Sequence, residues 1–194
     1  MKSFRSRCIA AFIGAALAAS AANAATIATF ADPAPDGSTP LFAYDGNALT
    51  GGWSLGGLTL LTPGLPLVPD IADATFVMSP LTVDSINGSV VLLSGGQIEF
   101  FDGVDLVFQI TFDGASLTTP FGFGASEFAG YNVQFSGPNV PGDLTAEAFA
   151  FAFANPQGSP DDFTVTASFT SSAIPEPASL AALALLACVG LRRR

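Results

Sequence analysis

The sequence has no histidine, and its cations and cysteines are confined to the two ends. All six Lys and Arg residues lie in the first seven or the last three positions, and Cys8 and Cys188 lie in terminal apolar segments. Residues 25–172 therefore carry a formal charge of −15, from fifteen of the sixteen carboxylates. A stretch without cations cannot neutralise phosphates, which argues against nucleic-acid binding and against attraction to anionic lipid. The same absences exclude a Ser-His-Asp triad, a thiol nucleophile, a Schiff-base lysine and a conventional zinc site.

The first 24 residues have the pattern of a secretory signal peptide. A basic segment at residues 1–7 precedes an apolar run that extends to about Ala19. Ala22 and Ala24 then supply the small residues that signal peptidase requires. We predict cleavage after Ala24, which leaves one domain over residues 25–172, long enough to bury a core without disulfides.

The C-terminal end carries a second apolar segment, residues 178–191, between Ile174-Pro175-Glu176-Pro177 and a cluster of Arg192, Arg193 and Arg194. Fourteen helical residues span about 21 Å, which is less than the roughly 30 Å hydrocarbon layer, so a removable tail fits better than a lasting transmembrane helix. The arginines orient this segment with its end in the cytoplasm and the acidic domain outside. Pro175 and Pro177 keep the preceding strip extended, as a peptide-cleaving enzyme requires.

The order of these three elements resembles the PEP-CTERM sorting signal of Gram-negative bacteria. The resemblance covers about 21 residues, 174–194, and it assigns Pro175, Glu176 and Pro177 to the sorting motif of a tail at residues 173–194. It implies recognition by an exosortase, a transpeptidase-like enzyme of the inner membrane in species that make exopolysaccharide. The partners expected are therefore signal peptidase, an exosortase-like enzyme, the inner membrane transiently, and exopolysaccharide at the cell surface or outside the cell.

The stretch between the two ends alternates with the period of β-strands. Residues 106–112 and 163–169 place apolar side chains opposite polar ones, and residues 148–153 alternate Ala with Phe, which predicts a central strand with covered alanines. Further strands are expected at residues 25–30, 53–60, 75–78, 89–93, 97–101 and 131–135. We expect a loop at residues 31–40 and a linker at residues 170–177.

Turn signals separate these segments: Asn87-Gly88, Gly95-Gly96, Asp102-Gly103, Asp113-Gly114 and Pro141-Gly142. Eight to ten short strands at this spacing predict an all-β fold, an antiparallel β-sandwich of jelly-roll or immunoglobulin-like type. An N-terminal signal helix and a C-terminal apolar helix would flank it. The alternative, a right-handed β-helix, lacks the fixed repeat of about 20 residues that it needs.

Carboxylates are the only strong catalytic groups in the central stretch. A glycosidase would use two of Glu99, Glu127 and Glu147. However, no two of them share a strand at a spacing that places a catalytic pair, and aromatic residues for stacking on sugars are scarce. Glu147 is in phase with the phenylalanines of residues 149–153, and we interpret it as the exposed start of that strand. We therefore predict no catalytic residue.

Three pairs of aspartates are candidate Ca²⁺ ligands because turns with Asp and Gly supply carboxylate and carbonyl oxygens. They are Asp102 with Asp105, Asp161 with Asp162, and Asp70 with Asp73. None fits an EF-hand loop, and the alternative is a set of turn-forming, solubilising aspartates. No other cofactor is expected.

These patterns predict an exported, non-enzymatic protein of the cell surface or extracellular matrix, with a structural or binding role in exopolysaccharide or biofilm. The alternatives from other classes are a secreted carboxylate-based glycoside hydrolase and a carbohydrate-binding module.

Overall fold

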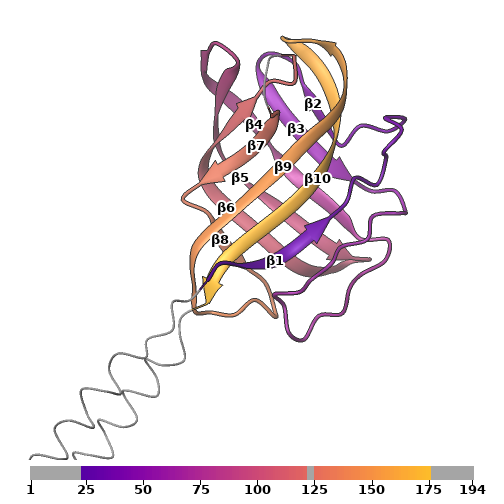
Figure 1. Cartoon of the computed structure of the whole chain (residues 1–194), viewed down its shortest axis with the longest axis vertical. Helices are drawn as coiled ribbons and strands as arrows, with labels where there is room; N and C mark the ends of the chain where they lie inside the picture. Colours follow the sequence, from indigo (N-terminus) through magenta and orange to yellow (C-terminus); the bar gives the residue numbers. More distant parts are fainter. Residues whose placement is uncertain (1–22, 122–124, 176–194) are drawn as a thin grey trace, which may run out of the picture. The chain divides into compact units, whose positions relative to one another are not determined.

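The computed structural model describes residues 23–121 and 125–175, which form ten β-strands and no helix (Figure 1). Five of the strands are 13 residues or longer. The strands are β1 Ala25–Phe30, β2 Phe42–Tyr44, β3 Ala48–Trp53, β4 Thr75–Asn87, β5 Val90–Asp102, β6 Asp105–Thr118, β7 Glu127–Tyr131, β8 Gln134–Ser136, β9 Leu144–Ser159 and β10 Asp162–Pro175.

Eight of these strands form a closed antiparallel barrel. The hydrogen-bonded order is β10-β2-β3-β4-β5-β6-β7-β9, and β9 pairs in turn with β10, which closes the ring (Figure 1). β1 pairs with the part of β10 beyond β2, and β8 pairs with β6. The predicted jelly-roll or immunoglobulin-like β-sandwich is therefore wrong, because a sandwich has two separate sheets, whereas here one sheet closes on itself.

Glycines inside long strands explain this difference. The expected turns at Gly95-Gly96 and Asp113-Gly114 lie within β5 and β6, where the chain bends and continues. A Cβ on Gly95 would lie 2.7 Å from the Asp113 carbonyl oxygen, so only glycine allows this approach of the two backbones. Such positions let a long strand curve around one core, whereas a chain of short strands favours a sandwich.

Phenylalanine fills the interior of the barrel. Phe151 lies at the centre, with ring centroids 4.8 Å from Phe169 and 4.9 Å from Phe42. Phe30 brings β1 into the same core, with its ring centroid 5.5 Å from that of Phe169. Nine phenylalanines are fully buried: Phe30, Phe42, Phe76, Phe100, Phe108, Phe128, Phe151, Phe163 and Phe169. An eight-stranded barrel is just wide enough for side chains to fill, and here they do.

Several local predictions are confirmed. The apolar positions of residues 108–112 and 163–169 face the core, residues 31–40 form a loop, and residues 25–30 form β1. At the start of β6 the expected alternation fails, since Val107 is buried and Leu106 is only half-buried, because the register with β5 shifts between Phe100 and Phe101. Asn87-Gly88 and Asp102-Gly103 form hairpin turns in which Gly88 and Gly103 have φ values of 64° and 61°. Positive φ at these positions is the conformation that glycine favours.

Other local predictions are wrong. Residues 53–60 do not form a strand, since β3 ends at Trp53. Residues 131–135 are divided between β7 and β8 at Asn132, which has a φ of 52°. The expected linker at residues 170–177 is occupied by β10 as far as Pro175. Ala148 and Ala152 on β9 are exposed rather than covered.

The expected flanking helices fall on residues 1–22 and 176–194, outside the described residues. Over residues 23–121 and 125–175, no helix is long and apolar enough to cross a membrane. Residues 24–174 form one compact unit. Ala25 at the start of β1 pairs with Ala173 near the end of β10, so the first strand of this unit begins beside the end of the last strand (Figure 1).

Candidate functional site

The outer face of β5, β6 and β8 gathers neutral hydrogen-bonding side chains. Two cross-strand rows run over these strands: Gln97, Thr111 and Gln134 in one, and Glu99, Gln109 and Ser136 in the other. The residues between them, Ile98, Ile110 and Phe135, are buried in the core, so the two rows face outward. With Ser79 of β4, these six residues form what we call the amide face. It holds three of the four glutamines of the chain.

Hydrogen bonds within the amide face leave part of its donors and acceptors free. Ser136 Oγ donates to Gln109 Oε1 at 3.4 Å, and Thr111 Oγ1 donates to the Gln134 carbonyl at 3.5 Å. Over the described part of the chain, the side-chain amides of Gln97 and Gln134 form no hydrogen bond. These amides are therefore available to a ligand, each with two donor hydrogens and an acceptor oxygen.

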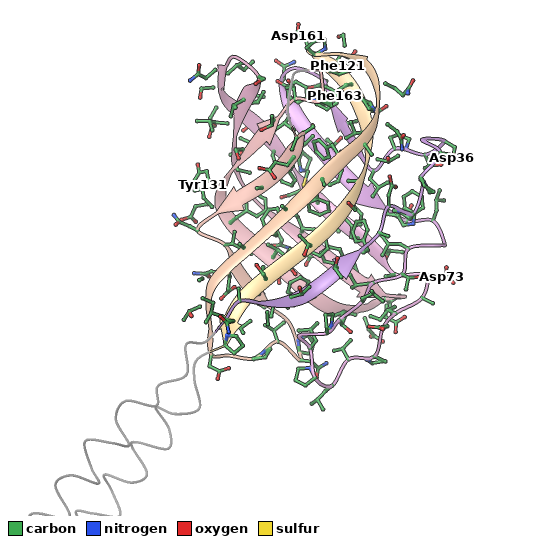
Figure 2. The ribbon with its side chains drawn as sticks, in the orientation of Figure 1. Asp36, Asp73, Phe121, Tyr131, Asp161 and Phe163 are labelled. Carbon is green, nitrogen blue, oxygen red and sulfur yellow. The ribbon has the colours of Figure 1, made fainter. Side chains whose placement is uncertain are left out.

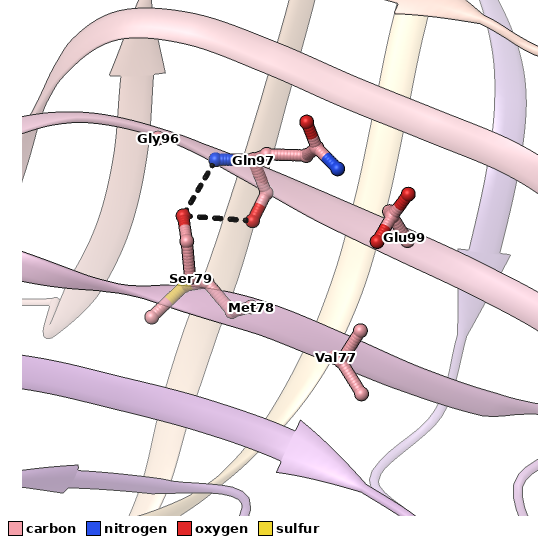
Figure 3. A pocket seen from close by; sticks show the side chains of 6 residues that line it. All are labelled: Val77, Met78, Ser79, Gly96, Gln97 and Glu99. Atoms are coloured by element: carbon pink, nitrogen blue, oxygen red, sulfur yellow. Dashed lines mark hydrogen bonds between the residues drawn. The ribbon is translucent and has the colours of Figure 1, made fainter.

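The β4–β5 ladder opens beside this face and leaves a hollow. Backbone pairing runs from Thr75 to Met78 on β4 and resumes at Val83. Across the gap, Ser79 Oγ accepts the Gln97 N–H at 3.0 Å (Figure 3). Pro80 contributes to the gap because it lacks an N–H group. The hollow has a volume of about 530 Å³ and is lined by Val77, Met78, Ser79, Gly96, Gln97 and Glu99 (Figure 3).

A second hollow, of about 360 Å³, adjoins the first through Val77, which lines both. Trp53 also lines it; this indole is 7% exposed, and its buried Nε1 has no hydrogen-bond partner among residues 23–121 and 125–175. Gly52 lies opposite Val77 on the neighbouring strand and leaves the surface flat there. One cross-strand row thus runs over five strands, from β3 to β8: Gly52, Val77, Glu99, Gln109 and Ser136.

The charge of this surface is low for a strongly acidic protein. Glu99 is the one carboxylate in the amide face, and residues 25–172 contain no side-chain cation. Tyr131 lies at the end of β7 (Figure 2) and is 50% exposed. Its ring covers Gly114 of β6. Beside it, Asn132 Nδ2 donates to Asp113 Oδ2 at 3.1 Å. A half-exposed aromatic ring at the end of β7 and the hydrogen-bonded amide of the next residue therefore lie beside β6.

The structure does not bring the candidate catalytic acids together. Glu99 is opposite Gln109 of β6, whereas Phe128, next to Glu127, is opposite Leu117. Eight residues along a strand correspond to about 26 Å, far beyond the roughly 5–10 Å of a glycosidase pair. β6 and β8 separate Glu147 from Glu99. At these positions on the sheet, the three acids form no catalytic pair.

Glu147 is half-buried, so its interpretation as an exposed strand start is wrong. β9 begins earlier, at Leu144, and the Glu147 carboxylate accepts the backbone N–H of Phe135 in β8. Burial raises the pKa of Glu147, and the hydrogen bond from Phe135 partly opposes that shift. Glu147 thus holds a short strand to the barrel, which is a structural role.

The aspartate pairs lie in separate places. Asp102 and Asp105 face each other across the β5–β6 turn and line a hollow of about 470 Å³ together with Asn139. Asp161 lies in the β9–β10 turn, far from Asp73 in Figure 2. Within residues 23–121 and 125–175, no three acidic, His or Cys side chains gather where they could hold a metal ion. Ca²⁺ binding by Asp102, Asp105, Asp161 and Asp162 stays a prediction.

The third pair, Asp70 and Asp73, organises a loop. Asp70 Oδ1 accepts the Thr62 N–H at 3.0 Å, and Asp73 Oδ1 accepts the Gly57 N–H at 2.7 Å. These bonds fix the loop between β3 and β4, as turn-forming aspartates do.

The predicted processing residues are described only in part. Ala24 is exposed just before β1, and Pro175 ends β10. The carbonyl of Ile174 accepts a hydrogen bond from Thr145 Oγ1 at 3.1 Å. Ala22, Glu176, Pro177, Arg192, Arg193 and Arg194 lie outside the described residues.

Sequence reasoning missed the amide face. Gln109, Thr111 and Gln134 stand on the polar side of segments whose alternation was recognised, so their outward direction was predictable. Their proximity was not, because it depends on which strands pair and in what register.

The fold and this face define an antiparallel barrel with a filled aromatic core and a cation-free, hydrogen-bonding outer surface. A scan against protein-family models found no match, and searches of curated proteins and of solved structures found none either.

Proposed function

We propose that this protein is an exported, non-enzymatic component of the cell surface or of the extracellular polysaccharide matrix, sorted by an exosortase-type system. The two terminal segments of the sequence support export and sorting. The observation that carries the binding or structural role is the arrangement of the barrel, in which the interior is filled by side chains and the polar groups lie outside. Such an interior leaves no room for a substrate, so recognition takes place on the outer surface.

The separation of the acids supports binding over hydrolysis. A glycosidase needs two carboxylates on either side of one bond. The β6 residues opposite Glu99 and opposite Phe128, the neighbour of Glu127, are eight positions apart along β6. The Glu147 carboxylate already accepts the Phe135 N–H. The carbohydrate-binding alternative is favoured by a specific observation, the amide face, and is developed below.

Intact-mass measurement of the protein as exported by its own cells tests this proposal. We expect a mature chain that begins at Ala25 and lacks the Arg192, Arg193 and Arg194 cluster. Replacing Pro175, Glu176 and Pro177 by alanine should leave the precursor in the inner membrane. A control with Pro33→Ala and Pro35→Ala, in the loop before β2, should be processed normally. Recovery of residues 174–194 in the exported form would show that the sorting proposal is wrong.

A further inference from the structure

We propose that the amide face and the hollows beside it bind an uncharged polysaccharide chain that lies across the strands from β3 to β8. This inference rests on the proposed function for the source of the polymer, but the site itself is argued from the face alone.

The chemistry of the face selects hydroxyl-rich, uncharged ligands. Glutamine amides and the hydroxyls of Ser79, Thr111 and Ser136 both donate and accept hydrogen bonds, as sugar hydroxyls do. An acidic polymer would need Lys or Arg to bind its carboxylates or sulfates, and residues 25–172 contain neither. Glu99 in the middle of the face and the surrounding charge of −15 would repel it.

The dimensions of the face fit a polymer better than a small molecule. Strands of a sheet are about 4.8 Å apart, so the five-strand row from Gly52 to Ser136 is about 19 Å long. The row of Gln97, Thr111 and Gln134 runs parallel to it, about 7 Å away. The surface is thus a track several sugar units long and about one wide. Val77, which is 50% exposed, supplies an apolar floor for the C–H faces of sugar rings.

A protein partner fits this surface less well. The centres of protein interfaces are rich in aromatic and other apolar side chains, whereas the track has one large exposed apolar residue, Val77, and the adjoining hollow adds one more, Leu55. A second copy of the chain would bring two cation-free surfaces of −15 together, which repel.

Trp53 lies at one end of the track and provides a direct readout. It is the one tryptophan of the chain, and it lines the hollow that shares Val77 with the amide-face hollow. A polymer that occupies the track should therefore change the fluorescence of Trp53.

The test measures binding by the full chain purified in an uncharged detergent. The probes are a soluble β-1,3-glucan, dextran and galactomannan, the neutral fraction of the producing cells' own exopolysaccharide, and alginate as the acidic polymer. Affinity electrophoresis and Trp53 fluorescence are measured for each. We expect at least one neutral polymer to bind and to change the fluorescence, with alginate inert at physiological salt.

The variant with Gln97→Ala, Gln109→Ala and Gln134→Ala should weaken this binding at least tenfold, because each lost neutral hydrogen bond weakens it roughly twofold to tenfold. The matched control is Gln157→Ala, which removes the fourth glutamine, an exposed residue of β9 outside the amide face. It should bind as the unmodified protein does. Melting temperatures verify that both variants are folded.

Four results would overturn the proposal. They are no binding to any neutral polymer, equal loss in the triple variant and the Gln157 control, no loss in the triple variant, or tighter binding to alginate than to every neutral polymer. Release of reducing ends that Glu99→Gln abolishes would instead make the protein a hydrolase. Because binding is measured on purified protein, its failure is distinct from a failure of export or sorting, which the mass measurement detects.

Discussion

The inner face of β4, β5 and β6 carries a row of aromatic side chains, and the adjacent row on the outer face carries mainly polar ones. On the inner face Phe76, Phe100 and Phe108 are directly opposite one another, with ring centroids 5.6 and 5.8 Å apart. One residue further along β4, Val77 lies in the outer row, with Glu99 and Gln109 beside it on β5 and β6. Because side chains alternate between the two faces, neighbouring residues of one strand serve different purposes. The inner row provides packing, and the outer row presents hydrogen-bonding groups to solvent.

The largest difference between the faces should appear when one side chain of each is truncated. Phe100→Ala removes a fully buried ring and leaves a cavity, which should lower the free energy of unfolding by about 3–5 kcal/mol. Gln109→Ala, on the outer face of the paired strand, should change it by less than about 0.5 kcal/mol. Urea unfolding measures both. Similar losses in the two variants would contradict the division of roles between the faces.

Adding a methyl group to glycines on the two faces should give a smaller difference in the same direction. In Gly51→Ala the new Cβ would overlap the ring of Phe42, which is 1% exposed and has no space to move. We expect a loss of about 1–3 kcal/mol in the free energy of unfolding. In Gly114→Ala the new Cβ would overlap Tyr131, which is half-exposed and is free to turn towards solvent.

The Gly114→Ala variant should therefore lose less stability than Gly51→Ala in the same urea titration. It should also expose the Tyr131 ring further, which tyrosine absorbance detects. A greater loss for Gly114→Ala would show that the Tyr131 ring is held in place on the outer face.

The inner face was largely predictable from the sequence, and the closure of the barrel was not. Alternation at residues 108–112 and 163–169 identifies the buried side chains whichever sheet they belong to, whereas at the start of β6 it selects Leu106 and the structure buries Val107. A sandwich and a barrel use the same alternation, so the choice depends on whether β10 pairs with both β9 and β2, which is a long-range contact. Gly95-Gly96 and Asp113-Gly114 predict a turn by composition, but cross-strand pairing carries the strands through them.

The candidate site was less predictable than the core for the same reason. Each residue of the amide face has an ordinary polar position in its own strand. The site exists because the register places Gln97, Thr111 and Gln134 in one row. By contrast, Glu147 carried a visible signal, since its phase matched that of Phe149 and Phe151. That phase places it towards the barrel, where burial raises its pKa.

The half-buried Glu147 and the exposed aspartates Asp36 and Asp45 have pKa values shifted in opposite directions. A carboxyl whose pKa is higher in the folded than in the unfolded state makes the folded state less stable as pH rises through that range. Glu147 therefore adds stability as pH falls from 7 towards its ordinary value of 4.5. Asp45 has the opposite shift, since the N–H groups of Asn47 and Ala48 lower its pKa. The N–H of Ser38 does the same for Asp36.

Stability should therefore rise on mild acidification and fall again as pH drops through 3.8, the ordinary pKa of Asp36 and Asp45. In Glu147→Gln the gain between pH 7 and 5 should shrink, by less than about 1 kcal/mol because solvent still reaches the carboxyl. Gln at this position can still accept the Phe135 N–H. Glu127→Gln, an exposed residue, removes the same charge and should keep the gain. The measurement is the unfolding free energy at each pH; equal profiles for the two variants would assign the gain to general charge repulsion.

The smallest effect expected is that of Ca²⁺ on the outer aspartates. Ca²⁺ takes six to eight oxygen ligands, whereas the β5–β6 turn presents Asp102 and Asp105 with Asn139 beside them. A cation that bound the folded state at a hundredfold excess over its Kd would add about 2.7 kcal/mol of stability. We expect a much smaller gain in stability, because two carboxylates at a solvated turn hold Ca²⁺ weakly. Added Ca²⁺ then acts mainly by screening the −15 charge. The melting temperature in millimolar Ca²⁺ should then match that in NaCl of equal ionic strength. A larger rise with Ca²⁺, abolished by Asp102→Asn with Asp105→Asn but retained in Asp161→Asn with Asp162→Asn, would instead establish a calcium site at this turn.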